Sequence, residues 1–193
     1  AAYSACLPQN KTKTIEKQTK KGEKMNDKTI YWAKVKPQAV IPSKRDEDAG
    51  YDLYPCFDED YIMIAPHQVK MIPLGIASAF SDRYVVLLKE RGSTGTKNIA
   101  QRSGVIDSGY RGEYMCPVSN LNDDHILVLA KAHVNEAQLP QSTLAYRMIP
   151  YEKAICQALI LELPKLEKQE ISYDELLEMR SERMEGKLGS SGK

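Results

Sequence analysis

Short apolar runs follow one another from Ile30 to about Leu163, and they limit the folds that are open to this chain. The runs are rich in Val, Ile, Leu and Tyr, and residues such as Pro, Gly, Asp and Asn separate them. They cover residues 30–35, 61–64, 69–72, 84–88, 126–130 and 155–161. Many short strands with turn residues between them are typical of a β-sandwich or β-barrel. The sequence therefore predicts an all-β domain.

The two ends of the chain lack this pattern. Residues 1–24 are polar and rich in lysine, with no period that would bury one face, so we expect them to be disordered. The stretch Lys20–Met25 can be encoded by GGAGAA-containing DNA ahead of ATG, and we expect 1–24 to be a non-native leader before a start at Met25. Ser172 with Glu175 three residues later predicts a capped helix over 172–180, before a flexible tail over 186–193.

The length of 193 residues suits one domain with tails. We expect a domain over 25–165 and a C-terminal arm over 166–193. The chain has 27 Lys and Arg against 26 Asp and Glu, so it has no basic footprint for stable nucleic-acid binding. No apolar run approaches the roughly 20 residues that span a bilayer, and we expect a cytoplasmic protein without a membrane partner.

The cysteines and histidines do not form a metal-binding pattern. The four cysteines are far apart and include no C-x-x-C pair, which favours buried free thiols. The three histidines are scattered, and none lies beside a cysteine pair. We therefore expect no metal ion that is held mainly by protein side chains.

Two segments in the first half of the chain carry groups that suit a phosphate or metal site. Asp48–Leu53 is a turn that enters a strand, and its Asp52 is either a turn-capping carboxylate or a group that supports a metal ion through water. Arg91–Lys97 follows an apolar strand and offers a guanidinium, hydroxyls and flexible N–H groups to phosphate oxygens. It lacks the Walker spacing, and a plain Ser/Gly loop remains the alternative.

Two later segments add a carboxylate, an aromatic ring and a glycine-rich end. Gly104–Glu113 predicts a hairpin, whose Asp107 can accept a proton from water and whose Tyr110 can form a wall against a sugar. A purely structural Asx-turn is the alternative reading. Arg183 and the glycines and serines after it either wrap a polyphosphate or form a linker end.

Taken in order, these segments resemble the five motifs of the dUTPase family, and the resemblance covers Asp48 to Gly192. It implies an all-β, distorted jelly-roll or β-barrel fold with a short C-terminal helix and a glycine-rich tail. It also implies hydrolysis of dUTP to dUMP and pyrophosphate by water attack on the α-phosphate, assisted by Mg²⁺. The family is usually a homotrimer whose C-terminal arm is exchanged between subunits.

The resemblance assigns roles to individual residues. Asp107 would activate the attacking water, Tyr110 would pack under the deoxyribose, and Asp52 would support Mg²⁺ through water. The phosphates and the fourth motif would involve Arg91, Ser93, Gly95 and Gln157. Uracil would be read by backbone groups of the segment that holds Gly104, Val105, Ile106 and Met115. The tail clamp would use Arg183, Leu188, Gly189, Ser190 and Ser191.

Several positions depart from the family pattern. The serine of the second motif is displaced to Ser93 behind Gly92, and Ala154 stands where a basic residue is usual. Leu188 stands where an aromatic residue would cover the uracil, and Gly109 replaces an acidic residue. A second Arg-Ser-Gly at 102–104 is fused to the Asp107 segment, and we do not assign it to the phosphates.

Two rival functions fit part of this pattern. A dCTP deaminase has a similar segment around the aspartate but carries a catalytic glutamate on the next strand, and residues 114–118 here contain no carboxylate. A regulatory protein would keep the nucleotide pocket as a sensor and use the polar segment 119–145 as a partner surface. The presence of both carboxylates and the tail favours the enzyme.

Overall fold

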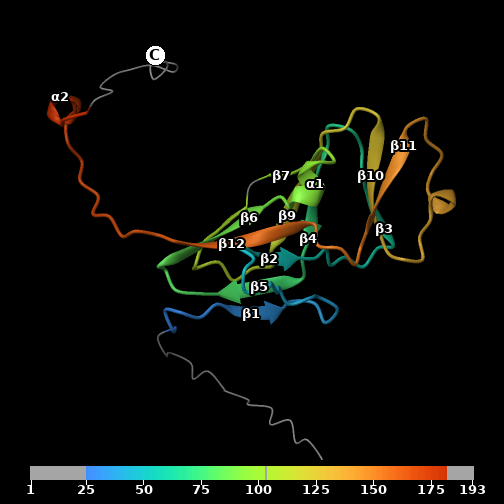
Figure 1. Cartoon of the computed structure of the whole chain (residues 1–193), viewed down its shortest axis with the longest axis horizontal. Helices are drawn as coiled ribbons and strands as arrows, with labels where there is room; N and C mark the ends of the chain where they lie inside the picture. The colour runs from blue at the N-terminus through green and yellow to red at the C-terminus, as the bar shows by residue number, and fades with distance from the viewer. Residues whose placement is uncertain (1–24, 103, 182–193) are drawn as a thin grey trace, which may run out of the picture.

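The computed structural model describes residues 25–102 and 104–181, and β-strands make up most of its regular structure (Figure 1). The strands are β1 (Tyr31–Lys34), β2 (Gly50–Leu53), β3 (Tyr61–Ile64), β4 (Val69–Pro73), β5 (Ile76–Ala79), β6 (Tyr84–Lys89), β7 (Ile99–Gln101), β8 (Val105–Ile106), β9 (Met115–Asn120), β10 (His125–Ala130), β11 (Ala145–Pro150) and β12 (Cys156–Glu162). The short helices are α1 (Gly92–Gly95), η1 (Glu136–Gln138) and α2 (Tyr173–Glu178). The prediction of an all-β fold is confirmed.

Each of the six predicted apolar runs contains a strand, namely β1, β3, β4, β6, β10 and β12. The apolar pattern did not reveal β2, β5, β7, β8, β9 and β11, although β2 lies in Asp48–Leu53, which was expected to enter a strand. The strands β7 and β8 have only three and two residues, too few to show an alternation. Pro117 interrupts the apolar pattern of β9, although that strand pairs with both β4 and β7.

The strands form four small sheets, and the central one positions most of the candidate site. Its order is β2-β12-β6-β8, and all its pairings are antiparallel. The β6 sequence YVVLLK is apolar over most of its length, which suits a strand covered on both faces. The core around it includes side chains from several sheets, among them Leu53, Phe57, Ile64, Ile72, Phe80, Val86, Leu88, Tyr114 and Leu127.

An outer sheet, with the order β11-β10-β3, lies at one end of the molecule (Figure 1). The pair β10 and β11 is parallel, so the chain must return between them through a connection, which is residues 131–144 with η1. This sheet has a small apolar cluster of its own, built on Val128, Ala130 and Leu139. The outer sheet is therefore a partly separate unit that is attached to the central barrel.

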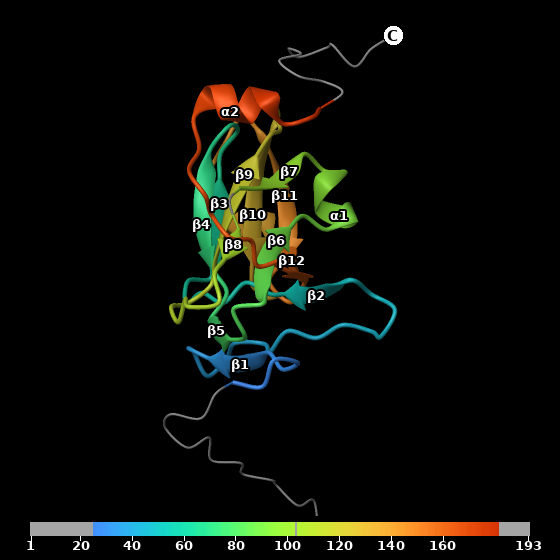
Figure 2. The same ribbon diagram turned by 90° about the vertical axis from the view of Figure 1, so that its left-hand side faces the viewer.

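The chain leaves the barrel after β12 and runs as an extended arm to α2, which lies well away from the strands in Figure 1. Figure 2, seen from the left-hand side of Figure 1, has α2 above β9 at the upper end of the picture. Ser172 caps α2 by accepting from the Glu175 N–H, and Glu175 caps in return, so the predicted capped helix is confirmed. Apolar side chains on this arm are exposed, with Leu166 at 85%. The arm has the apolar groups that a protein partner would cover.

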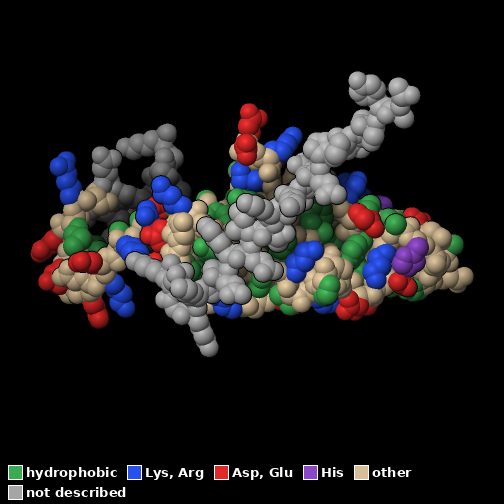
Figure 3. Space-filling model, turned by 90° about the horizontal axis from the view of Figure 1, so that it is seen from below, with side chains coloured by type: hydrophobic (Ala, Val, Ile, Leu, Met, Phe, Trp, Pro, Cys, Tyr) green, Lys and Arg blue, Asp and Glu red, His purple; other side chains and the backbone are tan. Residues whose placement is uncertain are grey.

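Buried free thiols were predicted, and Cys56, Cys116 and Cys156 confirm this, whereas Cys6 lies outside the described residues. A hydrogen bond with Cys116, together with burial, raises the pKa of the Cys156 thiol well above its usual value. Within the two described ranges, no helix has both the length and the apolar character needed to cross a membrane. Acidic and basic side chains are interspersed on the face seen in Figure 3, in keeping with the near-zero net charge.

Gly104–Glu113 was predicted to form a hairpin, and this prediction is wrong because the strands on its two sides do not pair with each other. Strand β8 pairs with β6, whereas β9 pairs with β4 and β7, so the two flanks of this segment belong to different sheets. Between them the Tyr110 N–H donates to the Asp107 carbonyl at 3.0 Å and closes a turn. The turn thus links two sheets, and we call residues 107–110 the Asp107 turn.

Candidate functional site

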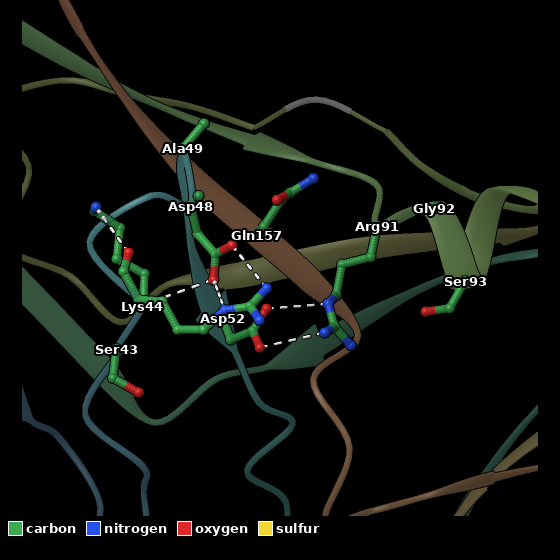
Figure 4. Close-up of a pocket in the computed structure, with 11 residues that line it drawn as sticks. Ser43, Lys44, Asp48, Ala49, Asp52, Arg91, Gly92, Ser93 and Gln157 are labelled. Atoms are coloured by element: carbon green, nitrogen blue, oxygen red, sulfur yellow. Dashed lines mark hydrogen bonds and ion pairs between the residues drawn. The ribbon is translucent and has the colours of Figure 1, made fainter.

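Four residues singled out from the sequence line one pocket of about 750 Å³, which we call the Arg91 pocket (Figure 4). They are Asp52 on β2, Arg91 after β6, Ser93 on α1 and Gln157 on β12. Strand register explains the convergence, because Gln157 lies opposite Asp52 on one side and Lys89 on the other. The end of the central sheet therefore collects side chains that are distant in the sequence.

Arg91 and Asp52 form a two-pronged ion pair at the floor of this pocket (Figure 4). Arg91 Nε lies 3.0 Å from Asp52 Oδ1, and Nη2 lies 3.2 Å from Oδ2. The two side chains are about one-third exposed, at 33% and 35%. The remaining prong, Nη1, donates to the carbonyl of Ala154 at 3.2 Å. This fork geometry fixes the orientation of the guanidinium, which lies beside the cavity paired with the Asp52 carboxylate.

Gln157 is also held in place. Its Nε2 donates to the Glu90 carbonyl at 2.8 Å, and a Cβ on Gly50 would overlap with its Oε1. Glycine at position 50 therefore makes the space that this amide needs. Burial on its own would raise the pKa of Glu90, but the backbone N–H groups of Glu90 and Gln101 donate to the carboxylate, and its pKa lies below the usual value.

The pocket has a second wall, which consists of Ser43, Lys44, Arg45, Asp48, Ala49 and Gly50. The sequence analysis had singled out the segment that begins at Asp48 but missed residues 43–45. Arg45 forms an ion pair with Asp48 at 2.9 Å, which lowers the pKa of that carboxyl. Lys44 Nζ lies 5.5 Å from the centre of the Tyr51 ring. The pair of cations just before Asp48 was the signal that would have revealed this wall.

The Asp107 turn is not part of this pocket. Val86 pairs with Ile106, so Asp107 lies level with Val85, at the end of β6 opposite to Arg91. At about 3.3 Å per residue, the six residues from Val85 to Arg91 correspond to roughly 20 Å. Asp107 is also exposed to solvent. One chain thus carries two separate groups of candidate residues.

Tyr110 is 43% exposed, but its ring is fixed from behind. Its hydroxyl donates to the Glu113 carbonyl at 2.9 Å, and a Cβ on Gly112 would overlap with the ring. The buried Tyr114 ring lies behind it, with 6.4 Å between ring centres, and the Tyr114 hydroxyl is 2.6 Å from Ser78 Oγ. Tyr110 therefore presents one open face on a rigid backing.

The other predicted residues near the Asp107 turn lie outside the pocket. Gly104 is buried at φ +120, and a Cβ there would meet Leu88 at 2.8 Å. Val105 is 66% exposed, and Ile106 and Met115 are half-buried. Gly95 is an exposed residue of α1 that does not line the pocket. The predicted tail residues lie outside the described residues, namely Arg183, Leu188, Gly189, Ser190 and Ser191. Residues 1–24, which were expected to be disordered, lie outside them too.

The side chains near the pocket suit a metal ion only if other groups supply most of its ligands. Among residues 25–102 and 104–181, no three His, Cys, Asp or Glu side chains gather as a metal cluster. Asp52 has both carboxylate oxygens engaged by Arg91. Such a site fits a hard cation that is coordinated mostly by substrate oxygens and water, with Asp52 contributing charge nearby.

Sequence comparison identifies relatives across this region. The dUTPase family model matches residues 36–139. The chain is 33% identical over 103 residues to the deoxyuridine 5′-triphosphate nucleotidohydrolase of Leptospira interrogans. This alignment covers 51% of this chain and 70% of the relative. It is 33% identical over 150 residues to the corresponding protein of Mycobacterium sp. (strain JLS), covering 76% of this chain and 83% of the relative.

Solved structures agree at the level of the fold. A mutant dUTPase of Staphylococcus bacteriophage 80alpha with dUpNHpp superposes with a TM-score of 0.67 at 24% identity, covering 86% of this chain and 99% of that one. A mutant dUTPase from phage phi11 of S. aureus, described with a structural Mg(II) ion, gives 0.60 at 19% identity, covering 74% and 96%. The predicted dUTPase-type jelly-roll fold is confirmed.

Proposed function

The chain belongs to the dUTPase family, and on this basis we propose that it hydrolyses dUTP to dUMP and pyrophosphate by attack of water on the α-phosphate. The observation that carries the proposal is the pocket in which the Arg91–Asp52 fork, Ser93 and Gln157 converge. A fixed guanidinium with neighbouring hydroxyl and amide groups suits the oxygens of a triphosphate. The Leptospira and Mycobacterium relatives bear the name of this activity. We place the reaction in the cytoplasm.

The residues of the chain contribute mainly by binding and orientation. Arg91 neutralises phosphate charge and Ser93 donates a hydrogen bond. Gly95 lies outside the pocket, and its lack of a side chain would leave room for the substrate beside the segment. Gln157 and Asp52 keep Arg91 and its strand in register. Asp52 would support Mg²⁺ through water, and the ion would supply neutralising charge to the triphosphate. Asp107 takes the proton from the attacking water, and Tyr110 packs against the deoxyribose.

Because the Arg91 pocket and the Asp107 turn lie about 20 Å apart along β6, we propose that each complete site uses two copies of the chain. The assembly would be a homotrimer, with Asp107 and Tyr110 from one copy facing the pocket of another. Exposed Val69 and Met71 on β4 provide apolar surface for such contacts. Backbone groups near Gly104, Val105, Ile106 and Met115 would read the uracil edge.

The arm over 166–193 would reach a neighbouring site beyond the domain over 25–165. Its exposed Leu166, Tyr173 and Leu176 give it apolar groups to bury on another copy. By the family pattern, Arg183, Gly189, Ser190 and Ser191 would clamp the phosphates and Leu188 would cover the base. Deleting residues 183–193 should abolish turnover and preserve the folded barrel; retained turnover would remove the clamp from the mechanism.

The decisive experiment is a pyrophosphate-release assay with Mg²⁺ and dUTP, dTTP, dCTP or UTP as substrate. We expect release from dUTP and at least a hundredfold lower kcat/KM for the other three, the size of discrimination expected when a site fits one sugar and base. The Arg91→Ala variant serves as the control for contaminating phosphatases. Absence of release from dUTP would refute the proposal.

A further inference from the structure

The carbonyl oxygen of Lys97 receives hydrogen bonds from two side chains that belong to other parts of the fold. Arg147, on β11 of the outer sheet, donates from Nη1 at 2.9 Å. Asn122, in the turn between β9 and β10, donates from Nδ2 at 3.1 Å. The same Arg147 nitrogen lies 3.1 Å from Asn122 Oδ1, so the three groups form a closed triangle. We call Arg147 and Asn122 the Lys97 clamp.

Asn122 is itself anchored in the interior. It is 5% exposed, and both its backbone N–H and its Nδ2 donate to Asn120 Oδ1, at 3.0 and 2.9 Å. Asn120 is fully buried, and its Nδ2 donates to the carbonyls of Ile64 and His125 at 2.9 and 2.8 Å. A buried polar network with its groups satisfied in this way is rigid. The clamp therefore fixes the Lys97 carbonyl relative to β3 and β10.

The segment that the clamp holds has little packing of its own. Within residues 92–98 only Thr94 is buried, and a Cβ on Gly92 or Gly95 would meet nothing within 4 Å. Hydrogen bonds rather than apolar contacts must therefore fix this segment. Its N-terminal end follows Arg91, which is tied to Asp52 and Ala154.

The other end of the segment depends on the region around Lys97. The Lys97 N–H donates to the Thr94 carbonyl at 3.0 Å, and Asn98 follows in a left-handed conformation at φ 55. The Leu121 N–H then donates to the Asn98 carbonyl at 2.9 Å. In Figure 1, α1 is seen between β6 and the outer sheet. Loss of the clamp would leave this end attached mainly through Asn98.

We propose that Arg147 is a positioning residue for the segment that carries Ser93, and that it acts through the Lys97 carbonyl without touching the substrate. This inference rests on the proposed function, in which Ser93 contacts a phosphate. Arg147 does not line the pocket, so its effect must pass through the backbone of residues 92–98. Because phosphate contacts exist before and during the reaction, a displaced segment weakens both states and raises KM more than it lowers kcat.

The test compares Arg147→Ala, Arg147→Lys and Arg83→Ala with the unchanged protein. Arg83 is the matched control, because it is a half-exposed arginine that does not line the pocket. Its guanidinium lies 2.7 Å from the Glu162 carboxylate. Arg147→Ala should raise KM for dUTP about tenfold, with kcat within about threefold, and should weaken dUpNHpp binding by the same factor as KM. Arg147→Lys keeps one donor and should recover part of the affinity. Arg83→Ala should change neither constant.

A second measurement separates the clamp from the catalytic proposal. Hydrogen exchange of the backbone amides at 97, 98 and 121, without nucleotide, should be at least about tenfold faster in Arg147→Ala than in the Arg83→Ala control. Unchanged exchange would overturn the clamp whether or not the protein hydrolyses dUTP. Faster exchange with an unchanged KM and unchanged dUpNHpp affinity would overturn the positioning role. If the unchanged protein releases no pyrophosphate, the proposed function fails, and exchange together with dUpNHpp affinity still decides the inference.

Discussion

The Arg91 pocket and the Asp107 turn occupy opposite ends of the same sheet, and they differ in how much of a site each provides. In the pocket, Arg91 is held by Asp52 and Ala154, and Gln157 is held by Glu90. At the turn, Asp107 is exposed, and Tyr110 has one open face. The side chains of the pocket are held in place within a single chain, whereas the turn presents an exposed carboxylate that does not line this pocket. On the two-copy proposal, a single fold presents two halves of a site without forming the whole.

Removing the proton acceptor at the turn should have the largest effect. Asp107→Asn should lower kcat by about 10²–10⁴-fold, the usual contribution of a general base. Because the pocket is built from other residues, dUpNHpp should still bind with an affinity within about threefold. Steady-state pyrophosphate release and calorimetric titration measure the two quantities. Turnover at the unchanged rate would exclude Asp107 as the base.

Mixing two inactive variants tests whether the halves come from different copies. Asp107→Asn and Arg91→Ala should each be nearly inactive, but co-refolded oligomers should regain about a quarter of full activity, the share of sites that pair an intact Asp107 with an intact Arg91. Each variant refolded alone serves as the control. If the mixture stays as inactive as its components, both residues of a site come from one chain, and the two-copy proposal fails.

The pocket should be sensitive to the space beside Gln157. In Gly50→Ala the new methyl group overlaps with the Gln157 amide, which must give up its bond to Glu90. We expect a loss of about 1–3 kcal/mol in the free energy of unfolding and about a tenfold lower kcat/KM. Denaturant unfolding and dUTP kinetics measure these. Gly109→Ala is the matched control for the free energy of unfolding alone, since a Cβ there meets nothing within 4 Å; an equal loss of stability in both variants would contradict the steric explanation.

The backing of Tyr110 should give the smallest effect. Ser78→Ala removes the partner of the buried Tyr114 hydroxyl and should lower the free energy of unfolding by about 1 kcal/mol. The Tyr110 ring keeps its bond to the Glu113 carbonyl, so the preference for dUTP over UTP should change less than about twofold. Thermal unfolding and competition kinetics provide the readouts. A large loss of sugar preference would mean that Ser78, through Tyr114, sets the orientation of the ring.

The apolar pattern predicted six strands, and the Ser172 and Glu175 pair predicted α2, because these signals are local. The pattern could not predict β7 and β8, whose few residues are paired by distant strands. The hairpin prediction failed for the same reason: β8 found its partner in β6 rather than across the Asp107 turn. Of the pocket, the sequence indicated Asp52, Arg91, Ser93 and Gln157 through motif order, and it missed Lys44 and Arg45.

The sequence by itself determined the all-β class, the buried thiols, the family and the residue types that suit a nucleoside triphosphate. These properties depend on composition and short-range order. Only the tertiary structure decided that Gln157 lies opposite Asp52, that Asp107 lies at the far end of β6 from Arg91, and that Arg147 reaches Lys97. Those relations depend on strand register and on contacts between segments up to more than a hundred residues apart, which no local pattern encodes.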